Sequence, residues 1–416
     1  MDKNYQLLKG VRVIELGNYI AGPAAGRALA DWGAEVIKIE PPTKGDLVRY
    51  QVVLPGMVSK PEMTVGFEIA NANKKSMVVN TKTAEGREIL DKLLATANVF
   101  LTNNRTEALK KVGLDYETLH ARFPSLIWAQ LSGYGEVGPL AKNPGFDTIA
   151  YWAMSGALTD FCEKDTAPVV SPFGFGDLGC GITLAGAICA ALYNQKCTGE
   201  GRKVVVSLFG HAVWQMGVIL TCQPFGKDTF PKSRLETTPL NDSYRCKDGS
   251  WVMLSALEFD RHFPIIMKFI GREDLITDER FNTWEAARAN CKELIQIIGD
   301  GFAQYTREDL HQKLTEIDVP HSKMQNIKDL LDPKEESNQQ AVANEFIRPI
   351  THRNGVTLFE AATPVQFGGP HAAPRQNAPL LGEQTSYYLK EVGYTDEQIA
   401  QLMEKQIIIE HHDTNY

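Results

Sequence analysis

An alternation of strand and helix patterns runs through the first half of the chain and constrains its fold more than any other feature. Residues 11–16 and 35–40 have the apolar character of buried strands, and 22–32 is a helix of small residues that ends at Gly33. Strands joined by a helical crossover run parallel. The same alternation continues in 77–80, 84–95, 99–102, 126–131, 182–193 and 203–208. The sequence therefore predicts an α/β fold with a large, doubly wound, mostly parallel sheet.

The chain has 416 residues, which is too many for one ordinary core. Its character changes near residue 225, where a polar stretch begins that we interpret as a linker. Asp248-Gly249 between two apolar runs predicts a hairpin, and helices are expected at 260–270, 283–305 and 307–317. We divide the chain into a large doubly wound domain (1–225), a smaller α+β domain with linkers (226–339) and a C-terminal return to the large domain (340–416).

Charge and cysteine content exclude several classes of function. The chain has 43 Lys and Arg against 51 Asp and Glu, a net charge of −8, and no long basic run, so we expect neither nucleic acid nor a membrane as partner. No signal-peptide pattern or membrane-spanning apolar stretch is expected, which favours the cytoplasm. The seven cysteines form no C-x-x-C pair, and the histidines have no metal-ligand spacing, so no metal site is predicted.

A glycine-rich segment, 174–181, places Asp177 just before the apolar helix expected at 182–193. An ionised, exposed Asp in a tight turn at a helix start is suited to act as a nucleophile. The segment also fits G-x-G-x-x-G, but Asp177 would then repel a pyrophosphate, and the two prolines before the segment break up the preceding strand. A capped helix with no catalytic role remains an alternative.

Cationic and amide side chains gather around the predicted strands. They are Lys38, Lys44, Arg49, Lys74, Lys75, Asn103, Arg105, Lys110 and Lys111. Ligands of open α/β sheets bind at the carboxyl ends of the strands. Cations there would suit a phosphorylated ligand in an otherwise acidic protein.

The sequence resembles the class III CoA-transferases, the family that includes formyl-CoA and carnitine CoA-transferases. The segments that carry this resemblance are 8–16, 21–23, 32–42, 73–76, 113–116, 133–135, 138–139, 145–147, 155–156, Gly176-Asp177, 381–383 and 393–399. The resemblance implies an interlocked homodimer, Asp177 as the nucleophile, and a CoA thioester as substrate with no tightly bound cofactor. The family motif close to N-F-R-P-G is only partly kept, because Asn104, Thr106 and Glu107 replace its Phe, Pro and Gly.

The resemblance and the strand-end cations together place several residues at CoA: Lys38, Lys74, Lys75, Asn103, Arg105, Lys111, Tyr19, Ile20 and Ala21. Ile20 replaces a polar residue of formyl-CoA transferase, which favours a less polar acyl chain. The N–H groups of Gly176 and Gly179 are expected to stabilise the oxyanion.

The most similar pattern is the phenyllactate and 2-hydroxyisocaproate branch of anaerobic amino-acid fermentation. It implies CoA exchange between a 2-hydroxy acid and an enoyl- or hydroxyacyl-CoA, through an aspartyl anhydride and an aspartyl-CoA thioester. It leaves open a 2-hydroxyacyl-CoA dehydratase as a downstream partner.

Three alternatives remain at this point. Bile-acid CoA-transferases are near relatives, and a catalytically silent CoA-binding protein would share the fold. α-Methylacyl-CoA racemases need a His where Phe146 stands, so racemase chemistry is disfavoured.

Overall fold

The structure, a computed structural model, describes residues 5–50, 59–60, 63–225 and 233–411. The chain divides into two compact units, which are described separately. The large unit comprises Met1–Leu158, Val170–Cys222 and Gln339–Tyr416, and the small unit comprises Thr159–Val169 and Gln223–Asn338.

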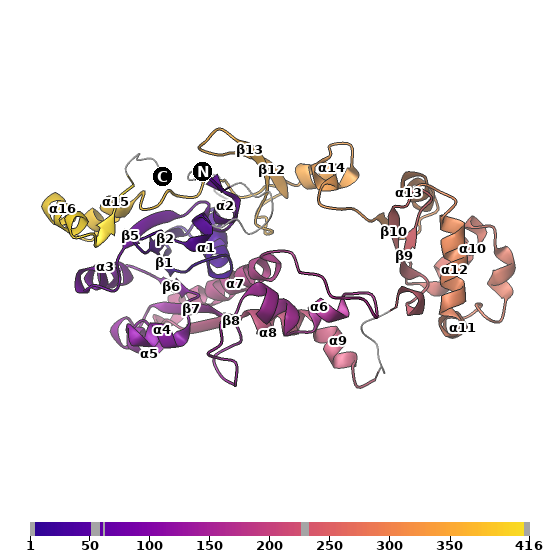
Figure 1. Ribbon diagram of the computed structural model, residues 1–416, viewed down its shortest axis with the longest axis horizontal. Helices are drawn as coiled ribbons and strands as arrows, with labels where there is room; N and C mark the ends of the chain where they lie inside the picture. The colour runs from indigo at the N-terminus through magenta and orange to yellow at the C-terminus, as the bar shows by residue number, and fades with distance from the viewer. Residues whose placement is uncertain (1–4, 51–58, 61–62, 226–232, 412–416) are drawn as a thin grey trace. The chain divides into compact units, whose positions relative to one another are not determined.

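A seven-stranded sheet forms the centre of the large unit (Figure 1). Its strands are β1 (Arg12–Leu16), β2 (Glu35–Glu40), β5 (Lys75–Val79), β6 (Val99–Thr102), β7 (Ile127–Ser132), β8 (Lys203–Ser207) and β14 (Ile408–Ile409). The order is β14-β5-β2-β1-β6-β7-β8, in which only β14 runs antiparallel to its neighbour. The prediction of a large, mostly parallel sheet in an α/β fold is confirmed.

Alternate residues of the strands face two separate cores, as in Val13 and Ile14 of β1. One core is covered by α1 (Ala21–Asp31), η3 (Asp147–Ala153), α7 (Phe175–Thr198) and α8 (Leu208–Gln215). The other is covered by α3 (Ala84–Leu94), α4 (Thr106–Lys111), α5 (Tyr116–Arg122), α15 (Thr385–Glu391) and α16 (Asp396–Glu404). Helices on both faces make the sheet doubly wound.

Helix α7 begins at Phe175, earlier than the expected start at residue 182. Gly181, which was expected in the turn, instead serves the packing of α7 against α1. A Cβ on Gly181 would lie 2.6 Å from Cβ of Ala24 in α1, so only glycine lets the two helices approach so closely. Although no membrane-spanning stretch was expected, α7 is long and apolar enough to cross a bilayer by length and composition. Its residues Leu184 and Ile188 are instead buried in the core.

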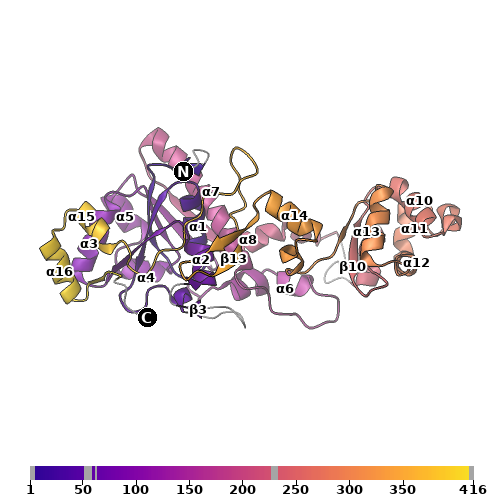
Figure 2. The same ribbon diagram turned by 90° about the horizontal axis from the view of Figure 1, so that it is seen from above.

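The C-terminal segment returns to the large unit and completes it. Helices α15 and α16 lie beside α3 in both views (Figures 1 and 2), where Lys405 pairs with Glu85. β12 (Ile347–Thr351) and β13 (Thr357–Ala361) form an antiparallel hairpin. The remaining elements of this unit are η2 (Leu47–Arg49), β3 (Ser59–Lys60), β4 (Met63–Thr64), α2 (Val65–Asn71) and α9 (Gly217–Cys222). The division of the chain into units falls within α6 (Ala157–Asp160) and within α14 (Glu336–Ala343).

The small unit has a three-stranded antiparallel sheet and its own helical core. Its elements are η4 (Arg234–Glu236), β9 (Asn241–Arg245), β10 (Trp251–Ser255), α10 (Phe259–Phe269), η5 (Glu273–Thr277), α11 (Trp284–Ala289), α12 (Cys291–Phe302), α13 (Arg307–Glu316), β11 (His321–Lys323) and η6 (Asp329–Leu331). The predicted hairpin is confirmed as β9–β10. The single helix expected at 283–305 is wrong, because the chain breaks at Asn290 into α11 and α12. The first part of the predicted polar linker, 226–232, lies outside the described residues.

Candidate active site

A cavity of about 300 Å³ opens where β1 and β6 end side by side. The chain runs outward from β1 through β2 to β5, then crosses back to β6 on the other side of β1 and continues through β7 to β8. The point between β1 and β6 is therefore the topological switch point of the sheet. The residues that line the cavity are Asn18, Tyr19, Ala21, Asn103, Asn104, Arg105, Thr106, Gln130, Leu131, Ser132, Gly133, Gly135, Ala141, Asn143, Pro144, Gly145, Phe146, Asp177 and Leu208. Five predicted site residues are therefore brought together: Tyr19, Ala21, Asn103, Arg105 and Asp177.

Asn103 holds the loop after β1 in place. Its side-chain nitrogen donates to the Asn18 carbonyl at 2.7 Å, and its oxygen accepts from the Asn18 N–H at 2.9 Å. Tyr19 follows with a φ of 60°, a left-handed conformation that is uncommon for this residue type. Its N–H donates to Asp46 at 3.0 Å, and its ring packs edge-on against Phe146. Asn103 thus shapes the cavity wall through Asn18, in addition to lining it.

A buried ion cluster lies beneath this loop and accounts for two of the predicted CoA contacts. Lys38 pairs with Glu15 and with Asp46, each at 3.0 Å, and Lys74 pairs with Glu15 at 2.7 Å. All four side chains are fully buried. Lys38 and Lys74 therefore point into the protein and hold carboxylates there, instead of extending to a phosphate as predicted. Their positions next to predicted strands favoured ligand binding, and nothing local in the sequence indicated the buried carboxylates with which they pair.

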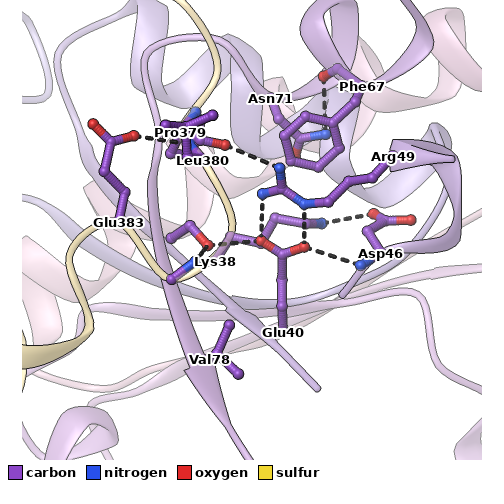
Figure 3. Close-up of polar contacts among 12 residues, drawn as sticks. Lys38, Glu40, Asp46, Arg49, Phe67, Asn71, Val78, Pro379, Leu380 and Glu383 are labelled. Carbon is purple, nitrogen blue, oxygen red and sulfur yellow. Dashed lines mark hydrogen bonds and ion pairs between the residues drawn. The ribbon is translucent and has the colours of Figure 1, made fainter. Parts of the chain in front are cut away.

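Electrostatics favour the charged forms of Lys38 and Glu40, whereas burial outweighs the attraction of Glu15 at Lys74 and lowers the pKa of Lys74 to about 7. Burial alone would lower the pKa of Lys38, but Asp46, Glu15 and Glu40 together raise it. Burial alone would raise the pKa of Glu40, but Arg49 outweighs it and holds that pKa at about 2. Figure 3 shows the Arg49 guanidinium between Glu40 and the ring of Phe67, which it approaches to 3.6 Å. Asp46 connects this cluster to the N–H of Tyr19 and so to the cavity wall.

Asp177 lies in the first turn of α7. The prediction that it is exposed and fully ionised is wrong. Only 9% of it is exposed. Burial raises the pKa of Asp177 to about 7, and the carboxylate of Asp147 adds to the rise. The physical reason is the early start of α7, which draws Asp177 inward with the helix. A carboxylate with a pKa near 7 is more basic than a solvated one and is ionised for half of the molecules at that pH.

The two glycine N–H groups expected at the oxyanion are already engaged. The Gly176 N–H donates to Oδ1 of Asp147 at 3.1 Å. Gly179 lies inside α7, beyond the first four residues whose N–H groups a helix leaves unpaired. The prediction for Gly176 and Gly179 is therefore not supported by their hydrogen bonds.

Three further predicted CoA residues lie away from the cavity. Ile20 is buried in a small core cluster with Val48 and Phe67, so it does not form the acyl wall. Lys75 begins β5 and is therefore at the opposite end of the strands from Asn103. Lys111 is exposed at the last residue of α4.

Sequence reasoning missed Asp46, Gln130 and Asp147. Gln130 is buried and donates to the Asn104 carbonyl at 2.8 Å, which supports the loop that carries Arg105. Its position at the carboxyl end of a predicted strand was a usable signal. Asp147 stands in a segment already recognised as family-like, but its contact with Gly176 could not be read from spacing.

One buried group outside the cavity has the residue types of a metal site. Ligand-type atoms of Glu68, His352 and Glu360 lie within 4.8 Å of one another. Nη2 of Arg375 is 3.0 Å from Glu68 and 2.6 Å from Glu360. These three residues could hold a divalent cation, but the guanidinium already supplies positive charge to both carboxylates. The group ties α2 to the β12–β13 hairpin.

Comparison with known proteins agrees with the site. The sequence model of the family described as CoA-transferase family III matches residues 8–385 of this chain. The chain belongs to this family. The resemblance seen in the sequence is confirmed, and the protein is a family III CoA-transferase.

Two curated relatives are similar over almost their full lengths. The (R)-2-hydroxy-4-methylpentanoate CoA-transferase of Clostridioides difficile is 38% identical over 406 residues, covering 97% of this chain and 99% of that protein. The cinnamoyl-CoA:phenyllactate CoA-transferase of Clostridium sporogenes is 39% identical over 407 residues, covering 97% of each.

Solved structures agree on the fold of this CoA-transferase. Rv3272 from Mycobacterium tuberculosis, in an orthorhombic crystal form, matches with a TM-score of 0.78 at 28% identity, covering 92% of this chain and 98% of that one. A CAIB/BAIF family protein from Brucella suis matches with a TM-score of 0.77 at 28% identity, covering 92% and 99%.

Proposed function

We propose that this CoA-transferase moves CoA from an acyl-CoA thioester to a free carboxylic acid, with Asp177 as the nucleophile. The observation that carries the proposal is the position of Asp177, a buried carboxylate in the wall of the cavity at the switch point of the sheet. Arg105 lies in the same wall and is exposed, so it can meet a phosphate of CoA.

The reaction proceeds through two covalent states of Asp177. A carboxylate oxygen of Asp177 attacks the thioester carbonyl, the C–S bond breaks, and CoA leaves as the thiolate. The thiolate then attacks the aspartyl carbonyl of the anhydride, which releases the donor acid and leaves an aspartyl-CoA thioester. The acceptor carboxylate reverses these steps, so the thioester energy is kept and no ATP is needed.

The substrates we propose are a 2-hydroxy acid and an enoyl- or hydroxyacyl-CoA, as in anaerobic amino-acid fermentation. The two curated relatives act, by their names, on hydroxy acids with a branched and an aromatic side chain. In this chain the edge-on pair of Tyr19 and Phe146 supplies an apolar surface at the cavity, which suits such a side chain. Bile acids are the second candidate class of acceptor.

Phe146 also weighs against a racemase. It lines the cavity and stands at the sequence position where a racemase carries its proton-transferring His. A phenyl ring holds no proton to transfer, so exchange at the α-carbon is not expected.

We also propose that the protein works as an interlocked homodimer in the cytoplasm, where a 2-hydroxyacyl-CoA dehydratase can use its product. Exposed large apolar side chains of α7, α8 and α9 support self-association. Trp214 of α8 is 83% exposed, and Tyr193 of α7 and Val218 of α9 are exposed too. Such side chains on one chain are typical of surfaces that a second copy covers.

Intact-protein mass spectrometry after mixing with a panel of acyl-CoAs, without acceptor, tests the proposal. We expect a CoA adduct that maps to Asp177 and is absent from Asp177→Asn. Asp300→Asn, at an exposed carboxylate of α12, is the control and should keep the adduct. Deuterium exchange into the α-carbon without any adduct would refute the transferase mechanism.

A further inference from the structure

The helix that carries Asp177 does not cap its own start. Its N-cap residue is Gly174, with a φ of 72° and no side chain to accept a hydrogen bond. The acceptor comes instead from Asp147, at the start of η3, whose Oδ1 receives the Gly176 N–H at 3.1 Å. A free helix N-terminus leaves several N–H groups unpaired, and a carboxylate is the strongest partner for them.

The contact between Asp147 and the first turn of α7 leaves no space for a side chain at Gly176. A Cβ on Gly176 would lie 2.4 Å from Oδ1 of Asp147 and 2.5 Å from Cγ of Tyr151. Asp147 is 5% exposed, and its Oδ2 has no hydrogen-bond partner among the described residues. Oδ1 therefore fixes the start of the helix, while Oδ2 makes no hydrogen bond within the described part of the chain.

The surroundings do not neutralise this charge. The titratable groups around the two carboxylates are Tyr151 of η3, Cys180 of α7, His211 of α8, which packs on Tyr151, and Tyr19 and Arg105 in the cavity wall. No ion pair of Asp147 or Asp177 occurs in the part of the chain that the structure describes. The pKa of Asp147 is raised to about 6 by burial, against the backbone N–H groups of Gly176, Phe175 and Gly174, so it too is mostly ionised above neutral pH.

We propose that Asp147 is a positioning residue that fixes the first turn of α7 and, by its negative charge, favours the acylated forms of Asp177. This inference rests on the proposed role of Asp177. Free Asp177 is an anion beside another anion, whereas its anhydride and its CoA thioester are uncharged. Covalent capture therefore relieves a repulsion that the folded protein imposes on the free enzyme.

Two substitutions separate the two roles. Asp147→Asn keeps an oxygen acceptor for the Gly176 N–H and removes the charge, whereas Asp147→Ala removes both. For Asp147→Asn we expect an unchanged Tm, an acidic limb of kcat/KM shifted down by roughly one pH unit, and about tenfold less aspartyl-CoA adduct at equilibrium. For Asp147→Ala we expect, in addition, a lower kcat and a lower Tm.

Asp115→Asn is the matched control. Asp115 is also a buried helix cap and accepts from the Thr118 N–H at 3.1 Å at the start of α5, which covers the other face of the sheet. It should leave the pH profile and the adduct unchanged.

A wild-type pH limb and adduct level in Asp147→Asn would overturn the role of the charge. Wild-type kcat and Tm in Asp147→Ala would overturn the positioning role. If the wild-type enzyme forms no adduct, or Asp177→Asn keeps its activity, the proposed function has failed, and this result is distinct from either outcome at Asp147.

Discussion

Replacing Lys38 by methionine tests whether this residue supports the fold or binds CoA. Lys38 contacts Glu15, Asp46 and the Gly17 carbonyl, and its side chain is fully buried. Methionine preserves most of the volume but leaves Asp46 without its cation, while Glu15 keeps Lys74. Removing one partner of a buried ion pair costs about 3–5 kcal/mol.

The expected change in Tm follows from the size of the large unit. That unit has roughly 290 residues, and unfolding entropy is about 2.1 cal/mol/K per residue, or about 0.6 kcal/mol/K in all. The loss of about 3–5 kcal/mol should therefore lower the Tm of this unit by about 5–8 °C.

Differential scanning calorimetry at one protein concentration, paired with steady-state kinetics, provides the measurement. Lys111→Met is the control, because Lys111 is exposed at the end of α4 and should change the Tm by less than about 1 °C. If Lys38→Met keeps the wild-type Tm but raises the KM for the CoA donor, the structural role assigned to Lys38 is wrong.

Three further outcomes are expected. Gly176→Ala should lower kcat by about a hundredfold, because its Cβ meets Asp147, whereas Gly186→Ala, with open space in the same helix, should not. Arg375→Met should cost about 3–5 kcal/mol in urea unfolding, and Arg353→Met, from a more exposed pair, less than about 1 kcal/mol. Since burial raises the pKa of Asp177 to about 7 and attack needs the anion, kcat/KM should fall tenfold per pH unit below that value; a limb near pH 4 would contradict this assignment.

The strands and their parallel arrangement could be predicted because local pattern determines them. β6 was predicted residue for residue, since 99–102 is a short apolar run between a helix and polar residues. The position of Asp177 near the start of a helix and the clustering of Asn103 and Arg105 at the same strand end also follow from local order.

Other features depend on contacts between distant segments. Gly181 looks like part of a turn in the sequence, and only the proximity of Ala24 explains it as a helix-packing residue. Lys38 and Lys74 have the spacing of ligand-binding cations, yet the burial of Glu15 decides their orientation. Asp147 acts on a helix that is far from it in the sequence.

Because the C-terminal segment of the large unit follows the small unit in the chain, the ribosome finishes the large unit last. The edge strand β14 pairs with β5, and Arg375 forms an ion pair with Glu68 of α2. Both β14 and Arg375 come after the small unit in the chain. At about 5–20 residues per second, the last stretch takes on the order of 4–16 s to emerge. Both segments of the small unit, Thr159–Val169 and Gln223–Asn338, have by then been synthesised. The sheet edge of the large unit therefore stays unpaired while the small unit is already synthesised, and chaperones or a second copy can reach this edge during that interval.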